Sequence, residues 1–347
     1  MAKTKVLIVD DSALIRQILA AVFRSDPEID LVGEAADPYV AWEMIKATKP
    51  DVLTLDVEMP RMDGLSFLAK LMAARPTPVV MISSLTERSC ETTLRALELG
   101  AVDFITKPKL DVRRGMGELA ADILDRVKGA ARVRPRPRPI HGPAAVRPAT
   151  SDAMIRTTDT VIAIGASTGG TEALCEVLTG LPAHANGIVI VQHMPEKFTK
   201  SFAERLDSLT KIRVREAKDG DRIHTGLALV APGGRHMEVK RSGAEYSVRV
   251  FDGETVNRHR PSVEVLFRSC ARWVGRNAVG VMLTGMGGDG AEGMAEMRRA
   301  GAYTIAQNEE TCVVFGMPKV AIEKGGVEDV LPLDRIAQAI MNRTANV

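Results

Sequence analysis

The sequence predicts an α/β protein built from two doubly wound parallel-sheet domains. Short β-branched runs alternate with stretches of helical periodicity on both sides of a segment rich in proline and arginine. The chain has 347 residues, and roughly 150 residues per domain gives two domains. Hydrophobic residues make up 45% of the chain and charged residues 26%. This composition supplies a core for each domain and excludes wholesale disorder.

The first half predicts five strands, each followed by a helix. We expect helices near residues 12–23, 39–47, 65–74 and 88–99 and a last helix that ends at residue 127. Strands alternating with helices are typical of a parallel sheet that is covered by helices on both faces. The five strands are expected at the runs KVLIVD, LVGEA, VLTLD, VVMIS and DFITK.

The second half predicts another parallel sheet, because apolar runs again alternate with helical stretches. The runs are TVIAIG, GIVIVQ, LALVAP, AVGVMLT and AYTIAQ. Between residues 235 and 252, the segments HMEVKR and EYSVRVF flank Ser-Gly-Ala. This pattern indicates a β-hairpin, which we place on the edge of the second sheet.

The segment between the halves is predicted to be an extended linker, since proline alternating with arginine cannot bury a core. We set the domains at residues 1–127 and 156–347, with the linker at 128–155. The net charge is +2, yet residues 129–151 hold five arginines and no acid, so the rest of the chain sums to 2 − 5 = −3. The positive charge is therefore local, and a basic strip that docks an acidic partner is the alternative to a solvated hinge. The arginines are Arg132, Arg134, Arg136, Arg138 and Arg147.

Cysteine spacing and hydropathy indicate the cellular setting. The four cysteines lie far apart without a CxxC pair, which argues against a disulfide framework and against a zinc site. No apolar run reaches the roughly 18 residues that span a bilayer, and there is no cleavable leader pattern. We therefore expect a cytoplasmic protein without direct membrane insertion, and the balanced charge does not indicate a nucleic-acid partner.

Polar residues at the strand ends of the first half predict a divalent-metal site. Asp10 and Asp11, Asp56, Ser83 and Lys107 each end one of the expected strands, and the carboxyl ends of parallel strands form the ligand-binding edge. Clustered carboxylates repel one another unless a cation neutralises them, and Mg²⁺ prefers such oxygen ligands. A carboxylate beside the metal can attack a phosphoryl group while Lys107 and Ser83 stabilise the added oxygens, and Asp56 is the candidate.

In the second half, Gly165-x-Ser167-x-Gly169 follows a strand and precedes a helical stretch. This pattern fits a strand-turn-helix elbow that carries a serine nucleophile. A dinucleotide-binding loop is the alternative, but there an acid should end the next strand and hold a ribose hydroxyl. Here that strand ends in Gln192 and His193.

An acid for this serine is supplied by the loop after the run AVGVMLT, whose only acid is Asp289. Serine needs a base, histidine suits neutral pH, and an aspartate orients the imidazole. Ser167, His193 and Asp289 supply these roles from three strand ends. Because their chain order differs from the Ser, Asp, His order of α/β-hydrolases, we do not assign that fold. The rival bases are His184, His224, His236 and His259, none of which directly follows an apolar strand entering the same sheet edge.

Residues 3 to about 125 resemble the receiver domain of two-component response regulators. The resemblance rests on Asp10-Asp11, on Asp56 followed by Met59-Pro60 and Asp63-Gly64, on Ser83-Ser84, and on Thr106-Lys107-Pro108. It implies a flavodoxin-like receiver that needs Mg²⁺ for phosphorylation. Phe104 matches an aromatic switch position, although a plain core aromatic is an equal alternative. The implied roles are Asp56 as phosphoacceptor, Asp10, Asp11 and the Glu58 carbonyl with Asp56 as metal ligands, and Ser83 and Lys107 as the phosphate-sensing pair.

With this receiver in front, the second half resembles the CheB family of chemotaxis protein-glutamate methylesterases. The segments GASTGG at 165–170, VQHMP at 191–195, HRPSVEVLF at 259–267 and LTGMGGDG at 283–290 carry the resemblance. It implies a Rossmann-like domain that hydrolyses γ-glutamyl methyl esters on the cytoplasmic helices of methyl-accepting chemoreceptors and deamidates receptor glutamines, without a cofactor for ester hydrolysis. It also implies a backbone oxyanion donor at Met286, Thr168 lining the site, and a chemotaxis histidine kinase as phosphodonor.

Three other interpretations compete with this one. They are a receiver joined to a DNA-binding output, a module that binds a nucleotide in the GASTGG loop, and an esterase for a small metabolite. For the family interpretation we hypothesise that the unphosphorylated receiver packs over the strand ends carrying Ser167, and that phosphorylation of Asp56 weakens this packing. The run from Arg258 to Ser262 either binds an acidic receptor surface or caps a helix at Ser262.

Overall fold

The computed structural model describes residues 3–107, 116–133 and 160–344. The chain divides into two compact units, residues 1–141 and 142–347. Most of the predicted arginine-rich linker, including four of its five arginines, lies outside the described residues.

The first unit is a five-stranded parallel sheet in the order β2-β1-β3-β4-β5. This is the flavodoxin-like strand order, with a switch point between β1 and β3, and it confirms the predicted fold class. Every residue of β3 and β4 is buried, because helices cover both faces. The strands are β1 (Thr4–Val9), β2 (Ile29–Ala35), β3 (Val52–Asp56), β4 (Val79–Ser83) and β5 (Asp103–Thr106).

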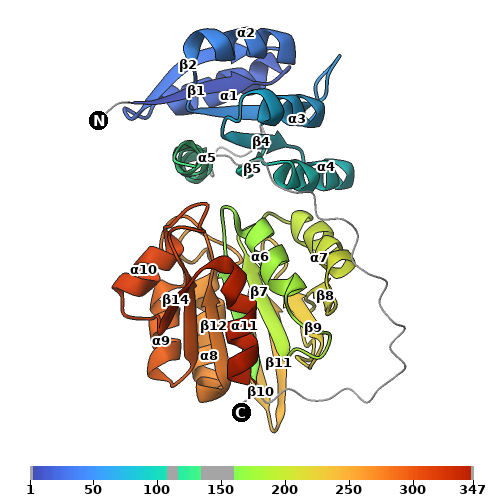
Figure 1. Ribbon diagram of the computed structural model, residues 1–347, viewed down its shortest axis with the longest axis vertical. Helices are drawn as coiled ribbons and strands as arrows, with labels where there is room; N and C mark the ends of the chain where they lie inside the picture. Colours follow the sequence, from blue (N-terminus) through green and yellow to red (C-terminus); the bar gives the residue numbers. More distant parts are fainter. Residues whose placement is uncertain (1–2, 108–115, 134–159, 345–347) are drawn as a thin grey trace. The chain divides into compact units, whose positions relative to one another are not determined.

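Local capping explains where the first helices start. The side chains of Ser12, Asp37 and Asp63 each accept a hydrogen bond from a backbone N–H in the first turn of the helix that follows, as N-caps do. In Figure 1, α1 and α5 flank one face of the sheet and the helices α2 to α4 flank the other. The helices are α1 (Ala13–Arg24), α2 (Pro38–Thr48), α3 (Gly64–Ala74), α4 (Glu87–Glu98) and α5 (Met116–Ala131).

Helix α5 continues four residues beyond the predicted domain end at 127. Val127 and Ala130 are buried, and Lys128 Nζ lies 2.8 Å from Asp26 and 2.9 Å from Glu28. These contacts hold the last turn on the unit, so the placement of the linker start at 128 was wrong.

The second unit is a seven-stranded parallel sheet in the order β14-β13-β12-β6-β7-β9-β8. From the central β6 the chain passes outward to β7 and then to the edge strand β8, and β9 lies between these two. The chain then returns to the other side of β6 as β12 and passes outward again through β13 to β14. The strand order therefore reverses between β6 and β12. The parallel strands are β6 (Val161–Ala166), β7 (Gly187–Gln192), β8 (Arg213–Glu216), β9 (Leu227–Val230), β12 (Ala278–Met282), β13 (Tyr303–Gln307) and β14 (Asp329–Leu331).

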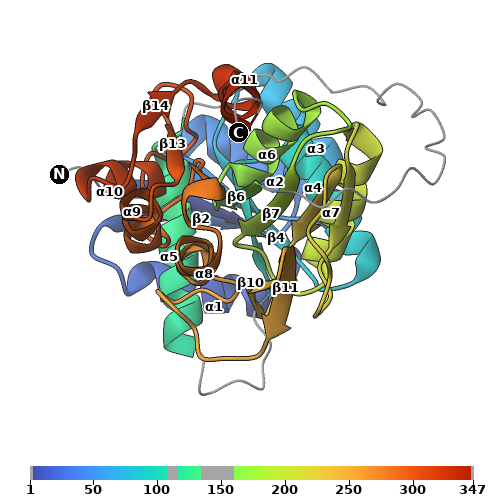
Figure 2. The same cartoon turned by 90° about the horizontal axis from the view of Figure 1, so that it is seen from below.

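Helices cover both faces of this sheet, as Figures 1 and 2 show. Helices α6, α7 and α11 lie on one face, while α8, α9 and α10 lie on the other. This three-layer arrangement confirms the predicted Rossmann-like class. The helices are α6 (Gly170–Thr179), α7 (Phe198–Leu209), α8 (Val263–Trp273), α9 (Ala291–Arg299), α10 (Met317–Glu323) and α11 (Leu333–Thr344), with a 3₁₀ turn η1 (Gly275–Asn277) before β12.

The predicted hairpin exists but does not extend the parallel sheet. Strands β10 (His236–Ser242) and β11 (Glu245–Phe251) pair only with each other among the described strands, as a separate antiparallel ribbon. Its apolar side chains, such as Met237 and Val248, join the core beneath α8. The edge placement was therefore wrong, because the short strands β8 and β14, which the sequence analysis did not predict, occupy the two edges of the sheet.

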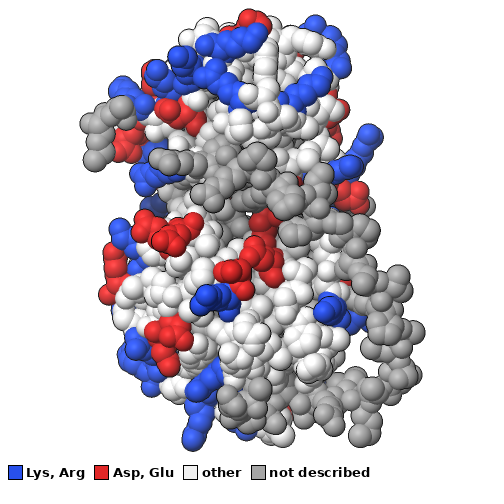
Figure 3. All heavy atoms as spheres, viewed as in Figure 1, with Lys and Arg blue, Asp and Glu red and all other residues white. Residues whose placement is uncertain are grey.

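The surface and the thiols agree with a globular protein. Lysines and arginines are interspersed with acids on the face shown in Figure 3. Cys90, Cys175 and Cys270 are buried, and Cys312 is half-buried. Within the described ranges, none of the helices has the length and apolar character that crossing a bilayer requires.

Candidate active site

Ser167 lies in the turn between β6 and α6, at the point where the strand order of the second sheet reverses. The Ser167 N–H donates to the Thr284 carbonyl at 3.0 Å, and the Gly170 N–H donates to the Ser167 carbonyl at 2.7 Å. Gly169, with φ of 76°, caps the start of α6, a conformation that glycine adopts without strain. Because Ser167 is 6% exposed, it sits in a tight, buried elbow, as the GxSxG pattern predicted.

His193 follows β7 directly beside this elbow. Ala166 pairs with Gln192 across the β6–β7 ladder, and the His193 N–H donates to the Ala166 carbonyl at 3.1 Å. Neighbouring strands lie about 4.8 Å apart, so the residues that follow them, Ser167 and His193, are adjacent. Gln192 strengthens the junction, since its Nε2 donates to the Ser167 carbonyl at 2.8 Å.

Asp289 completes the group from the loop after β12. Its Oδ2 lies 2.8 Å from His193 Nε2 and accepts the Val263 N–H at 2.7 Å, while its Oδ1 accepts Asn257 Nδ2 at 2.9 Å and Ser262 Oγ at 2.8 Å. Burial alone would raise the pKa of this carboxyl, but the His193 bond and the other donors lower it to about 2. Asp289 therefore stays ionised at neutral pH and faces the imidazole.

The approach of α8 to Asp289 depends on glycine. A Cβ at Gly165 would stand 2.3 Å from Val263 Cγ1, and one at Gly290 would stand 2.4 Å from the same atom. Side-chain carbons do not approach so closely, so only glycine at these positions lets the first turn of α8 reach the carboxylate. Ser262 is also the N-cap of α8, which is the capping role predicted for it.

Asn257 contacts Asp289, and His259 contacts His193. The sequence did not predict either contact. Asn257 and Arg258 have φ of 51° and 67° and form a tight turn in which Val256 and His259 exchange backbone hydrogen bonds. The turn points the Asn257 amide at Asp289 and stacks the His259 ring on His193, with centroids 3.7 Å apart and planes at 13°. Asparagine tolerates positive φ, but Arg258 stands where such a turn usually has glycine, so the sequence carried no clear signal for this hairpin.

The structure separates the other rival bases from Ser167. His184 is exposed in the turn before β7. His224 Nδ1 pairs with the Thr225 carbonyl before β9, and His236 Nε2 pairs with the Glu254 carbonyl on the hairpin. His193 is the histidine that follows the strand next to the elbow.

Thr168 and Met286 also lie next to Ser167. Thr168 is buried, and its carbonyl accepts a hydrogen bond from Thr284 Oγ1 at 3.0 Å. Met286 is half-buried and follows Gly285, where a Cβ would stand 2.8 Å from Ser167 Cβ. The glycine thus lets the backbone of this loop contact the serine side chain.

In the first unit, the predicted acidic cluster is present at the carboxyl edge of the sheet. Asp10 and Asp56 are buried and Asp11 is exposed, and carboxylate oxygens of the three lie within 4.8 Å of one another. Burial raises the pKa of Asp10, and it raises that of Asp56 to about 6 against the opposing effect of Lys107. Asp10 Oδ2 is buried without a hydrogen-bond partner among the described residues.

Lys107 contacts Asp56, and Ser83 ends β4, the strand next to the one that ends in Asp56. Lys107 Nζ donates to Asp56 Oδ2 at 2.7 Å and lies 3.7 Å from Asp10 Oδ2. Ser83 is fully buried and accepts a hydrogen bond from Thr93 Oγ1 at 2.7 Å. The Glu58 N–H donates to Asp56 Oδ1 at 3.3 Å, and the Glu58 carboxylate accepts Ser89 Oγ at 2.6 Å.

Phe104 is 3% exposed on β5. Such burial is expected of a core aromatic, which was the alternative to the switch role.

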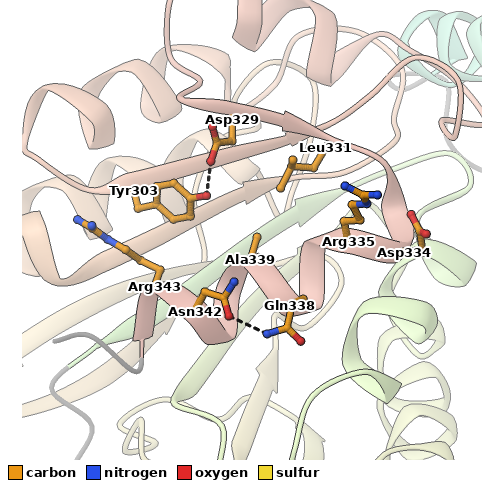
Figure 4. Close-up of a pocket in the computed structure, with 9 residues that line it drawn as sticks. All are labelled: Tyr303, Asp329, Leu331, Asp334, Arg335, Gln338, Ala339, Asn342 and Arg343. Atoms are coloured by element: carbon orange, nitrogen blue, oxygen red, sulfur yellow. Dashed lines mark hydrogen bonds between the residues drawn. The ribbon is translucent and has the colours of Figure 1, made fainter.

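A separate hollow lies along β14 and α11 (Figure 4). It has a volume of about 680 Å³ and combines acidic and basic side chains, among them Asp329, Asp334 and Arg335. Tyr303, whose hydroxyl donates to Asp329, is the first residue of β13, whereas Ser167 follows the last residue of β6. This part of the hollow therefore lies at the opposite end of the parallel strands from Ser167. None of the predicted site residues lines it.

Comparison with known proteins identifies both units. Residues 162–340 match the family model described as CheB methylesterase, and residues 6–114 match that of the response regulator receiver domain. The first match occupies the half of the chain for which a DNA-binding output was the alternative.

Similar proteins cover nearly the whole chain. It is 60% identical to protein-glutamate methylesterase/protein-glutamine glutaminase 2 of Pseudomonas aeruginosa, over 98% of this chain and 97% of that one. It is 55% identical to the protein-glutamate methylesterase/protein-glutamine glutaminase of Salmonella typhimurium, with the same coverage. The crystal structure of the Thermotoga maritima CheB methylesterase catalytic domain matches with a TM-score of 0.52 and 38% identity, over 53% of this chain and 98% of that one. The chain therefore belongs to the CheB methylesterase family, as an enzyme that joins a receiver domain to a methylesterase domain.

Proposed function

We propose that Ser167 is the nucleophile of a chemotactic methylesterase that hydrolyses γ-glutamyl methyl esters. Its oxygen bonds to the ester carbon as His193 removes the hydroxyl proton. The carbon–oxygen bond to the methoxy group then breaks, and the same proton leaves with methanol. Water next attacks the acyl-serine with His193 again as base, releases the glutamate carboxyl and restores the serine hydroxyl.

The observation that carries this proposal is the buried contact between His193 Nε2 and Asp289 at 2.8 Å. An aspartate on one ring nitrogen assigns the proton to that nitrogen and leaves the other to act as the base. Here the base is Nδ1, which is buried and has no hydrogen-bond partner in the described part of the chain. The carboxylate also stabilises the imidazolium that forms when Nδ1 takes up the serine proton.

The negative oxygen of the tetrahedral intermediate needs donors that are already in place. The backbone amide of Met286 is our candidate, because the preceding Gly285 brings this loop against Ser167. The N-terminus of α6, two residues after Thr168, adds the positive end of a helix dipole. Neither contribution requires a metal or cofactor in this domain.

The proposed substrates are methyl-accepting chemoreceptors, whose cytoplasmic helices carry the esterified glutamates. The similar proteins from Pseudomonas aeruginosa and Salmonella typhimurium are named for glutamate demethylation and glutamine deamidation. Both reactions pass through the same acyl-serine, since only the leaving group differs. One site therefore serves both substrates, with methanol leaving from the ester and ammonia from the amide.

The receiver domain is proposed to take a phosphoryl group on Asp56 from a chemotaxis histidine kinase. Mg²⁺ suits the pocket, because three carboxylates meet there and the buried Asp10 Oδ2 has no hydrogen-bond partner among the described residues. Asp10, Asp11, Asp56 and the Glu58 carbonyl would hold it. When bound, Mg²⁺ neutralises negative charge on the phosphoryl group. Lys107, already 2.7 Å from Asp56, pairs with a phosphoryl oxygen, and Ser83 donates to another.

Phosphorylation is proposed to raise the esterase rate. The two sites belong to one chain, so the receiver stays near the esterase domain at high effective concentration. In this proposal the unphosphorylated receiver restricts access to Ser167, and phospho-Asp56 relieves the restriction. Asp56→Asn removes the acceptor, so its activity should no longer respond to a phosphodonor.

Methanol release from methyl-labelled receptor cytoplasmic fragments tests both proposals. The intact chain and Ser167→Ala are compared with and without Mg²⁺ and a small phosphodonor. Release that needs Ser167 and rises with the phosphodonor supports the esterase and its activation. Release that survives Ser167→Ala contradicts the nucleophile, whereas Ser167-dependent release that ignores the phosphodonor contradicts the activation alone.

A further inference from the structure

The segment between β13 and α10 contains an apolar stretch, residues 313–315, that lies against the catalytic loops. The Val314 N–H donates to Thr284 Oγ1 at 2.9 Å, and its carbonyl accepts the Gly285 N–H at 3.1 Å. Gly285 pairs with Phe315 as a parallel bridge. Since Thr284 also bonds the Ser167 N–H and the Thr168 carbonyl, this stretch, which we call the 313–315 lip, is fixed to the serine elbow.

Glycines bring the lip next to Ser167. A Cβ at Gly169 would stand 2.5 Å from Val313 Cβ, and one at Gly285 would stand 2.8 Å from Ser167 Cβ. At the far end of the lip, a Cβ at Gly316 would stand 3.2 Å from Met286 Cα. The lip therefore borders the elbow, the start of α6 and the proposed oxyanion loop.

The lip presents apolar side chains that are only partly covered. Val313, Val314 and Phe315 are each half-buried. They follow β13, which lies beyond β12 from β6, whereas His193 follows β7 on the other side of β6. The lip is thus on the side of Ser167 away from the base. Because the leaving group must receive its proton from His193, the lip faces the acyl part of the substrate.

A protein substrate brings its own backbone close to this surface. A glutamyl side chain holds its ester carbon only about 4 Å from its own Cα, so the backbone that carries the ester comes close to Ser167. On a helix, the residues three and four positions away share the face of the ester-bearing residue. Those neighbouring side chains must contact whatever borders the serine.

We propose that the 313–315 lip is the docking surface for the substrate helix, and that it packs against apolar side chains three or four positions from the esterified glutamate. This inference rests on the proposed methylesterase function and deepens it. The lip then distinguishes an ester on a protein helix from the same ester on a small molecule, which lacks those neighbours.

The test compares two substrates for the intact chain with phosphodonor and Mg²⁺. One is a methylated receptor cytoplasmic fragment, and the other is the γ-methyl ester of an N-acylated glutamate amide. For Val313→Ser/Phe315→Ser we expect the ratio of kcat/KM for the receptor over that for the small ester to fall by about tenfold, as expected for truncated apolar contacts. The loss should appear chiefly as a higher KM for the receptor.

Two further variants keep the test decisive. Val313→Thr preserves the side-chain shape and should lower the ratio by about threefold even if the double variant fails to fold. Val330→Ser is the matched control, because Val330 is 47% exposed on the edge strand β14, and it should leave the ratio unchanged. An unchanged ratio in both lip variants overturns the proposal, whether both substrates lose activity equally or neither does. Wild-type chain that shows no Ser167-dependent methanol release from either substrate contradicts the methylesterase function itself.

Discussion

Asp289→Asn removes the charge that faces His193 while nearly preserving the shape of the side chain. The carboxylate accepts four hydrogen bonds, from Asn257, Ser262, Val263 and His193. An amide has one oxygen, so its nitrogen must face one of these two pairs of donors. If it faces Val263 and His193, the Val263 N–H loses its acceptor and His193 must present an unprotonated Nε2, which places its proton on Nδ1 and removes the base.

In the other orientation, the amide nitrogen faces Asn257 and Ser262, which can reverse their own polarity. His193 then keeps its tautomer but loses the negative charge that stabilises the imidazolium. Either orientation weakens the transition state, and we expect kcat to fall by about 10³- to 10⁴-fold, equivalent to ~4–5.5 kcal/mol. An unsatisfied buried donor adds a loss of folding stability of ~1–3 kcal/mol.

The assay is methanol release from receptor fragments with KM and kcat separated, alongside a thermal melt. Ser262→Ala is the matched control, since it removes one of the four donors to Asp289 but leaves the charge and the His193 contact. We expect it to cost about threefold to tenfold in kcat, with ~1 kcal/mol of stability from the lost α8 cap. An Asp289→Asn rate within tenfold of wild type would refute the assignment of Asp289 as the partner of His193.

Three further predictions concern Asp56 in the first unit and two residues packed around the site in the second. Burial raises the pKa of Asp56 to about 6, so the folded state keeps a proton between about pH 4 and 6 that the unfolded state has lost, and stability falls as pH rises through that window. Without Mg²⁺, Asp56→Asn should therefore raise the free energy of unfolding at pH 7 by up to ~3 kcal/mol and have little effect below pH 4. Thermal melts of the two proteins across this pH range check the prediction, and a variant that is less stable than wild type at pH 7 would contradict it. His259→Leu removes the ring stacked on His193 and should lower kcat about tenfold with little change in KM. His259→Phe keeps a ring, so its kcat should stay within about threefold of wild type. Equal losses of kcat in the two variants would rule out a role for stacking. Gly165→Ala places a methyl group against Val263 and should cost ~1–3 kcal/mol in a thermal melt, and an unchanged melting temperature would show that α8 can shift.

Both clusters of predicted site residues follow from a local rule. Strands in a parallel sheet all end at one edge, so residues that immediately follow apolar runs converge wherever those runs are neighbours. Ser167 follows β6 and His193 follows β7, while Asp10 follows β1 and Asp56 is the last residue of β3. Their convergence was predictable because each run of β-branched residues identifies a strand and its last residue.

Other elements could not be predicted in this way. The edge strands β8 and β14 are four and three residues long, too short for an apolar pattern to separate them from loops. They occupy the sheet edges on which the hairpin had been placed. The end of α5 depends on the contacts of Lys128 with Asp26 and Glu28, which lie about a hundred positions away in the chain.

By itself the sequence determined two parallel-sheet domains, an acidic pocket in the first and a serine, a histidine and an aspartate at strand ends of the second. Only the tertiary structure decided how Asp289 is held, because Asn257 and Ser262 are 32 and 27 residues away from it in the chain and reach it where α8 packs against β6. It likewise decided that His259 stacks on His193 and that residues 313–315 border Ser167. Hydropathy and strand periodicity are properties of neighbouring residues, whereas these contacts join segments that become neighbours only when the chain folds.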